Sequence, residues 1–299
     1  MPIDAIKPAA TEATDPRYRD LDAWEAPAIL DALLDSQAGA VAAVRAALPA
    51  LGRVVEAALP RLVAGGRLAY AGAGTSGRLA FQDGAELTPT FDWPRDRLAF
   101  LVAGGEQALV RAVEGAEDRT ETAAADVAAL ALGPNDVLLA LAASGTTPYT
   151  REAVRSARRA GCLTVGIANS PGAPLLAEAE IAVLVETGAE VVAGSTRLKA
   201  GTAQKIVLNL ISTTLMVRLG RVWRGEMVDM QATNAKLRLR AERMLRSLTG
   251  AGDDAIRAAL AAADGRVKLA VLLLHGMTRP NAEAALAGHG NHLRRVLQA

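Results

Sequence analysis

Hydroxyl side chains follow glycine in two segments where a helix is expected to begin. The first is residues 72–78, of sequence GAGTSGR, and the second is residues 143–148, of sequence ASGTTP. The first turn of a helix leaves backbone N–H groups without intrahelical acceptors, and the helix dipole favours an anion there. Either segment alone is equally well explained as an ordinary N-cap. Together they predict a phosphate pocket of neutral donors, formed by Gly74, Thr75, Ser76, Ser144, Gly145, Thr146 and Thr147.

Two glutamates are candidate acid–base groups. Glu86 follows the first segment by about two to three helical turns, and Glu117 lies in the later segment 113–118. A pair of carboxyl groups at one pocket can act as general acid and general base. The residues alone leave a second interpretation open, because most glutamates simply lie on the protein surface.

The first segment also satisfies the G-x-G-x-x-G pattern of dinucleotide sites. Such a site needs an acidic residue at the end of the next strand, where it binds a ribose hydroxyl. The next apolar run ends in Leu101–Gly105 and contains no acid. The sequence therefore disfavours a dinucleotide site.

Few residues are suited to metal or thiol chemistry. Cys162 is the single cysteine, which excludes an internal disulfide and a cysteine-based zinc site. The histidines are His275, His289 and His292, and the last two are spaced to share a helix face. No third metal ligand accompanies these two histidines, and no histidine lies near the hydroxyl-rich segments in sequence. We expect neither a metal nor another cofactor.

The composition excludes further classes. The chain has 33 basic and 32 acidic residues and a net charge of +1, which gives no basic footprint for nucleic acid or an anionic membrane. Residues 1–8 lack the features of a signal peptide. No apolar run approaches the ~18 residues of a membrane-spanning helix. We therefore expect a soluble cytoplasmic protein with no nucleic-acid or membrane partner.

Short apolar runs must position the candidate residues. They are residues 67–71, 98–103, 136–142, 163–167 and 181–185, and segments such as 150–160 between them are long enough for crossover helices. Hydrophobic residues make up 51% of the chain and aromatic residues only 3%, so the core must consist mainly of Ala, Val, Leu and Ile. This pattern predicts an α/β fold, with a parallel sheet covered on both faces and a ligand site beyond the carboxyl ends of the strands.

Helices are expected on either side of the sheet segment. Before Gly66, apolar spacing indicates helices from Ala28 and over residues 51–63. A long helix is expected over residues 198–219, and the chain after Gly220 again has helical spacing.

Taken together, these segments resemble a sugar-isomerase (SIS) phosphosugar-binding domain and, more widely, the N-acetylmuramic acid 6-phosphate etherase family. The resemblance runs from about residue 11 to the C-terminus. Its longest matching stretch is residues 194–205, of sequence GSTRLKAGTAQK. The other matching stretches are residues 11–12, 20–22, 67–78, 102–105, 112–118, 142–149, 188–192, 227–229 and 232–234.

The resemblance implies a fold and a division of the chain. The fold is a five-stranded parallel SIS domain over residues 58–221, between helical segments at 1–57 and 222–299. It also implies a homodimer with its site near the subunit interface.

The implied reaction removes the D-lactyl ether of N-acetylmuramic acid 6-phosphate. The products are N-acetylglucosamine 6-phosphate and D-lactate, as part of peptidoglycan recycling. Glu86 matches the family's catalytic acid and Glu117 its second active-site glutamate, while Ser195 and Lys199 join the hydroxyl-rich segments as substrate-binding residues.

The chain departs from the family around the first glutamate. The family usually reads Asp-Ala-Ser-Glu-Cys-Pro-Pro-Thr where this chain has DGAELTPT, residues 83–90. The substitutions at Ala85, Leu87 and Thr88 put fine specificity in doubt more than reaction type. Two alternatives remain open: a non-catalytic phosphosugar-sensing regulator, and a phosphosugar isomerase.

Overall fold

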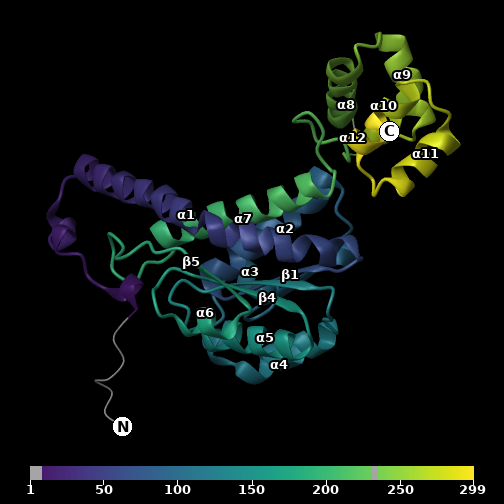
Figure 1. Cartoon of the computed structure of the whole chain (residues 1–299). Helices are drawn as coiled ribbons and strands as arrows, with labels where there is room; N and C mark the ends of the chain where they lie inside the picture. Colours follow the sequence, from purple (N-terminus) through teal and green to yellow (C-terminus); the bar gives the residue numbers. More distant parts are fainter. Residues whose placement is uncertain (1–8, 231–234) are drawn as a thin grey trace. The chain divides into compact units, whose positions relative to one another are not determined.

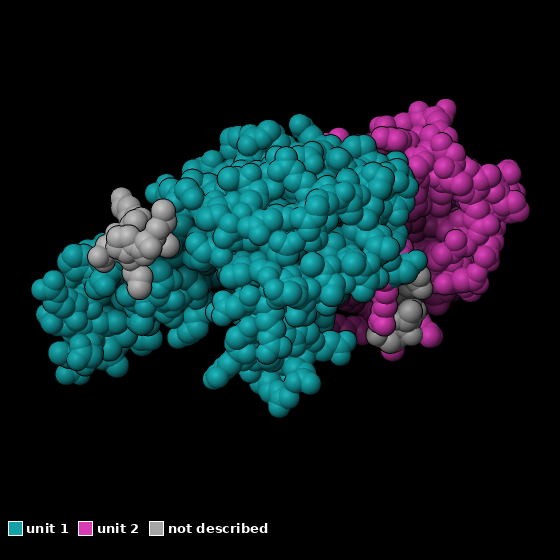
Figure 2. Space-filling model, turned by 90° about the horizontal axis from the view of Figure 1, so that it is seen from below, with its two compact units in different colours: residues 1–84, 96–212 teal, residues 85–95, 213–299 magenta. Residues whose placement is uncertain are grey.

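A computed structural model describes residues 9–230 and 235–299. The described chain forms two compact units, shown in different colours in Figure 2. The first unit holds the described residues up to 84 together with residues 96–212, and the second holds residues 85–95 and those from 213 onward. Two segments named above, residues 1–8 and 232–234, lie outside the described residues. The division at residues 57 and 221 stays a prediction.

The first unit is built on a five-stranded parallel sheet, which confirms the expected fold class. Its strands run in the order β2-β1-β3-β4-β5, and each pairs with its neighbours in parallel register. The five strands are β1 (Leu68–Gly72), β2 (Leu98–Val102), β3 (Val137–Leu141), β4 (Leu163–Ala168) and β5 (Ile181–Leu184). Each coincides to within about two residues with one of the apolar runs of the sequence.

Helices cover both faces of the sheet, as continuous burial of its central strands requires. On one face lie α4 (Thr120–Leu130), α5 (Pro148–Arg159) and α6 (Pro174–Glu178), and on the other lie α1 (Ala26–Val63) and α7 (Lys199–Arg218) (Figure 1). Alanines such as Ala69, Ala71 and Ala140 form much of the core beneath α4 and α5. Small side chains let these helices approach the sheet closely. The remaining helices of this unit include α3 (Gln107–Val110) and the first part of α2 (Gly74–Phe91).

Helix α1 is continuous, whereas the sequence predicted two helices before Gly66. Pro49 lies inside it and removes one backbone hydrogen bond, but the alanine-rich flanks keep the helix intact. An 18-residue window of α1 has a mean hydropathy of 1.4 and is 33% buried inside the protein. By length and composition alone this helix could cross a membrane, so the expectation that no segment approaches that length is wrong. Alanines raise its hydropathy without forming a run of large apolar side chains.

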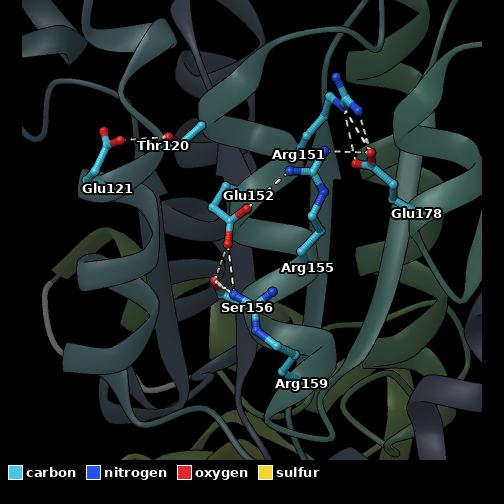
Figure 3. Close-up of polar contacts among 8 residues, drawn as sticks. All are labelled: Thr120, Glu121, Arg151, Glu152, Arg155, Ser156, Arg159 and Glu178. Carbon is cyan, nitrogen blue, oxygen red and sulfur yellow. Dashed lines mark hydrogen bonds and ion pairs between the residues drawn. The ribbon is translucent and has the colours of Figure 1, made fainter.

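Ion pairs attach α5 to α6. Arg151 and Arg155 of α5 both bind the Glu178 carboxylate, with Arg155 Nη2 2.7 Å from Glu178 Oε1 (Figure 3). Arg159 binds Glu152, which lies about two turns earlier on α5 itself. Burial alone would raise the pKa of Glu178, but the hydrogen bonds from the two arginines outweigh it and hold that pKa below its ordinary value. These contacts orient α5, whose first turn faces the carboxyl edge of the sheet.

A buried polar cluster connects β1, α2 and α7. The Asp83 carboxylate accepts hydrogen bonds from Tyr70 Oη at 3.1 Å, Asn209 Nδ2 at 2.7 Å and Ser212 Oγ at 3.2 Å. Burial raises the pKa of Asp83, while these three donors oppose the rise. Next to it, a Cβ on Gly84 would lie 2.6 Å from the Phe100 ring. An alanine at position 84 would therefore not fit beside Phe100 without a shift.

The second unit is helical and has its own core. Beyond residue 234 it contains α8 (Ala235–Thr249), α9 (Asp253–Ala262), α10 (Val267–Leu274), α11 (Arg279–Gly288) and α12 (Leu293–Gln298). Lys268 is buried among them, with Nζ 2.6 Å from Asp229 Oδ1 and donating to Asn291 O at 2.8 Å. Burial lowers the pKa of Lys268, and the paired Asp229 opposes that effect.

The starts of β1 and β3 are joined by an ion pair. Arg67 donates to Asp136 through its backbone N–H at 2.7 Å and through its guanidinium, with Nη2 2.7 Å from Asp136 Oδ2. Gly133 N–H donates to the same carboxylate at 2.9 Å. Burial alone would raise the pKa of Asp136, but the donors outweigh it and hold that pKa below its ordinary value.

We predict that Asp136→Asn lowers the free energy of unfolding by about 1–3 kcal/mol, because it leaves a partly buried guanidinium without its anion. Since the pKa of Asp136 is lowered in the folded state, its stabilisation is present above about pH 4 and is lost as the pH falls below that. Urea unfolding at pH 7 and at pH 3 measures both effects.

The matched control is Asp253→Asn, which breaks an exposed ion pair with Arg246. It should leave stability essentially unchanged. Equal losses for both variants at pH 7 would contradict the assigned role of Asp136.

Candidate active site

The site lies where the strand order of the sheet reverses. From β1 the chain crosses to β2 on one side and then returns to β3 on the other, so β1 and β3 flank the switch point where ligands bind in such sheets. Helix α2 begins just beyond β1, and α5 begins beyond β3. A cavity of about 350 Å³ opens there, lined by Glu12, Ala73, Gly74, Thr75, Ser76, Glu117, Asp118, Ala142, Ala143, Ser144, Thr146, Thr147, Pro148 and Thr196.

Two glycines place the start of α2 against the end of β1. A Cβ on Gly77 would lie 2.7 Å from Gly72 O, and a Cβ on Gly72 would lie 2.8 Å from Gly77 N. Gly77 N–H donates to Ala73 O at 3.1 Å. The N–H groups of Gly74, Thr75 and Ser76 precede this bond and have no intrahelical acceptor. The first and last glycines of the G-x-G-x-x-G string thus serve close packing of helix on strand.

The segment after β3 is held in shape by its own hydroxyls. Ser144 Oγ accepts from Thr146 N–H at 3.2 Å and lies 2.8 Å from Thr146 Oγ1. Gly145 has a φ of +70°, and a Cβ there would lie 2.3 Å from Ala173 Cβ, so only glycine fits. Gly145 therefore shapes the segment, while Ser144, Thr146 and Thr147 line the cavity. The first backbone bond of α5 runs from Arg151 N–H to Thr147 O at 3.1 Å.

Three carboxylate side chains line the same cavity as the backbone and hydroxyl donors. Glu117 lies in the short 3-10 helix η6 (Ala116–Asp118), which follows Gly115 in the left-handed conformation with φ +65°. Glu117 and Asp118 have exposed side chains, and Glu12 reaches the cavity from η2 (Ala10–Glu12). None of the residues that line this cavity is lysine or arginine. Among these lining residues, only backbone and hydroxyl groups can donate a hydrogen bond to an anion.

Glu86 lies on the part of α2 that belongs to the second unit. Its side chain is exposed, and it is not among the residues that line the cavity. The structure therefore brings Glu117 together with the hydroxyl-rich segments. Glu86 is not among the residues gathered there, and its part in the site stays a prediction.

The stretch at 194–205 contributes a different residue from the two expected. Thr196 lines the cavity, whereas Ser195 and Lys199 do not. The Lys199 ammonium donates to Ala189 O at 2.8 Å, and its backbone N–H donates to Glu190 at 3.0 Å. Glu190 is fully buried and also accepts from Ala200 N–H, so it caps the start of α7.

Three polar lining residues were not proposed as site residues from the sequence, namely Glu12, Asp118 and Thr196. Asp118 and Thr196 each adjoin a predicted site residue. Glu12 is distant in sequence, and its only signal was the resemblance of residues 11–12 to the family.

The histidines lie in the second unit. His289 follows α11 and His292 precedes α12, so they do not share a helix face as their spacing suggested. Burial lowers the pKa of His292. Within residues 9–230 and 235–299, no three His, Cys, Asp or Glu side chains gather in a way that could hold a metal ion.

Comparison with known families assigns the class. Residues 117–213 match the SIS domain, and residues 50–158 match the family described as glucokinase regulatory protein N-terminal SIS domain. The fold of the first unit is therefore that of an SIS domain.

Full-length relatives define the family more narrowly. A relative from Deinococcus radiodurans, named N-acetylmuramic acid 6-phosphate etherase, is 55% identical over 291 residues, covering 97% of this chain and 95% of that relative. Relatives with the same name from Streptomyces coelicolor and Salmonella choleraesuis are each 45% identical, covering 98% and 96% of this chain and 95% and 97% of theirs. The chain belongs to the N-acetylmuramic acid 6-phosphate etherase family.

We predict that Gly77→Ala disrupts the cavity, because the added Cβ meets Gly72 O at 2.7 Å. The start of α2 must then shift, which should lower stability by about 1–3 kcal/mol and weaken phosphate binding at least tenfold. Thermal unfolding and calorimetric titration with phosphate measure the two effects.

Gly52→Ala is the matched control, since nothing lies within 4 Å of its added Cβ in the interior of α1. It should leave phosphate binding unchanged and raise stability by up to about 1 kcal/mol. Unchanged phosphate affinity in Gly77→Ala would contradict the assigned position of the site.

Proposed function

We propose that this protein cleaves the D-lactyl ether of N-acetylmuramic acid 6-phosphate, giving N-acetylglucosamine 6-phosphate and D-lactate. One observation carries the proposal: the first turns of α2 and α5 and the Glu117 carboxylate line a single cavity. Family membership supports it, since the relatives described above all carry this activity in their names. Because those relatives match over nearly their full length, a sensing regulator and an isomerase are not favoured.

The substrate phosphate is assigned to the two helix starts. Gly74, Thr75 and Ser76, whose N–H groups have no intrahelical acceptor, line the same cavity as Ser144 and its neighbouring hydroxyls. A phosphate dianion is stabilised by such donors and by both helix dipoles. Neutral donors also leave the carboxylates of the cavity free of ion pairs with lysine or arginine.

The reaction is an elimination followed by addition of water. Opening of the sugar ring gives a C1 aldehyde, which acidifies the proton on C2. A base removes that proton, the C3–O bond breaks, and an acid protonates the departing lactate oxygen. Water then adds to C3 of the unsaturated aldehyde and restores the sugar. Each step needs only positioned proton donors and acceptors.

We assign the proton transfers to the two glutamates. Glu86 acts at the C3 oxygen, and Glu117 assists from the cavity wall. Glu117 is supported by its place in the cavity, and Glu86 by its match to the family's catalytic acid. Ser195 and Lys199 are not assigned a direct contact with the substrate, since neither lines the cavity. Lys199 already donates to Ala189 O and to Glu190. The proposed setting is peptidoglycan recycling in the cytoplasm.

We predict that Glu86→Gln and Glu117→Gln each lower the rate of D-lactate release by about 10²-fold or more. Glutamine keeps the shape of the side chain but cannot transfer a proton. An enzymatic D-lactate assay measures the rate, and thermal unfolding checks the fold.

Glu121→Gln is the control, because Glu121 is exposed, does not line the cavity, and accepts a hydrogen bond from the adjacent Thr120 hydroxyl. It should leave turnover unchanged. Wild-type turnover in either active-site variant would refute that residue's role.

A homodimer is proposed to form through α1. Leu30, Leu34, Val41 and Leu48 are 45–71% exposed and lie close to one line along this helix. Large apolar side chains in such a stripe are typical of an interface between protein subunits. The stripe also accounts for an apolar helix of which only 33% of the most hydrophobic window is buried within one chain.

We predict that the double variant Leu34→Glu, Val41→Glu converts dimers to monomers without unfolding the chain, because the charges cannot be buried in the interface. Sedimentation equilibrium measures the mass. Ala46→Glu, at an exposed position on another side of α1, should remain dimeric. A wild-type monomer, or a dimer in all three proteins, would exclude this interface.

A further inference from the structure

A chain of buried hydrogen bonds runs from the sheet to the cavity. Asn169 Nδ2 donates to Val185 O at 3.0 Å, just beyond the ends of β4 and β5. Gln204 Nε2, on α7, donates to Asn169 Oδ1 at 3.0 Å. Ser76 Oγ donates to Gln204 Oε1 at 2.9 Å. Asn169, Gln204 and Ser76 are at most 8% exposed.

The direction of every bond in this chain is fixed by its first acceptor. A backbone carbonyl such as Val185 O can only accept, so the Asn169 amide must present its NH₂ group there. The Asn169 Oδ1 oxygen then faces Gln204, so Gln204 must donate to it through its own NH₂ group. The Gln204 oxygen is left facing Ser76, and an amide oxygen cannot donate. The proton of the Ser76 hydroxyl is therefore directed away from the cavity.

Ser76 nevertheless lines the cavity. With its proton committed to Gln204, its oxygen offers only lone pairs to a ligand. A phosphate dianion has no proton to donate, so two lone-pair-bearing oxygens would repel each other there. A sugar hydroxyl or the N–H of an acetamido group is the matching partner.

We infer that the Ser76 hydroxyl accepts a hydrogen bond from a hydroxyl or amide N–H of the sugar and does not bind the phosphate. Ser76 thereby selects the sugar part of the ligand, while its backbone N–H remains with the phosphate. This inference rests on the proposed function and assigns one hydroxyl of that site to a different part of the substrate.

The hydroxyls beyond β3 behave differently. Ser144 Oγ and Thr146 Oγ1 lie 2.8 Å apart, and one of them donates to the other. The second hydroxyl of the pair keeps its proton for a ligand. The pair therefore supplies a donor suited to phosphate, and Ser144 provides a matched comparison for Ser76.

Calorimetric titrations at pH 8 with inorganic phosphate and with N-acetylglucosamine 6-phosphate test the inference. Ser76→Ala should weaken binding of the sugar phosphate about three- to tenfold and leave the affinity for inorganic phosphate unchanged. Ser144→Ala should weaken binding of both ligands by similar factors.

Gln204→Met gives an independent test, because it removes the acceptor and releases the Ser76 proton. The preference for sugar phosphate over inorganic phosphate should fall in this variant, without loss of phosphate affinity. Equal weakening of both ligands by Ser76→Ala would overturn the inference while leaving the phosphate site in place. A wild-type protein that binds neither ligand would overturn the proposed function and the inference with it.

Discussion

The contact between Gly72 and Gly77 is the constraint on which the site depends. Because neither residue has a Cβ, α2 starts directly on the end of β1, and its first N–H groups reach the switch point of the sheet. Two side-chain hydrogen bonds hold the same helix in place. Ser76 of α2 donates to Gln204 of α7, and Asp83 of α2 accepts from Tyr70 of β1. A bulkier residue at either glycine would displace all of these groups together.

The cavity combines two helix starts and several hydroxyls with carboxylates, and none of its lining residues is lysine or arginine. Helix starts and hydroxyls suit this combination, because they stabilise a phosphate without forming ion pairs with Glu117. A lysine in their place would bind the same carboxylate oxygens that the proposed proton transfers use. The ion pairs that attach α5 to α6 involve Arg151 and Arg155. The residues that attach α5 to α6 thus differ from those proposed to bind phosphate at its start.

Much of this arrangement could be predicted from the sequence, because its signals are local. Buried apolar runs located the five strands, and glycine followed by Ser and Thr located the two helix starts. Features that depend on distant segments were missed: Glu12 reaches the cavity from the N-terminal segment, Thr196 lines it where Ser195 and Lys199 were expected, and α1 continues through Pro49. The direction of the Ser76 proton depends on Asn169 and Gln204, which no local pattern connects to it.

The most direct test of the account is a crystal structure of the Glu86→Gln variant with N-acetylmuramic acid 6-phosphate. Phosphate oxygens are expected at about 2.7–3.2 Å from the N–H groups that begin α2 and from the Ser144–Thr147 hydroxyls. The sugar should extend towards Glu117, with a hydroxyl or amide N–H on Ser76 Oγ. A phosphate bound away from these groups would contradict the central claim that the two helix starts form the phosphate site.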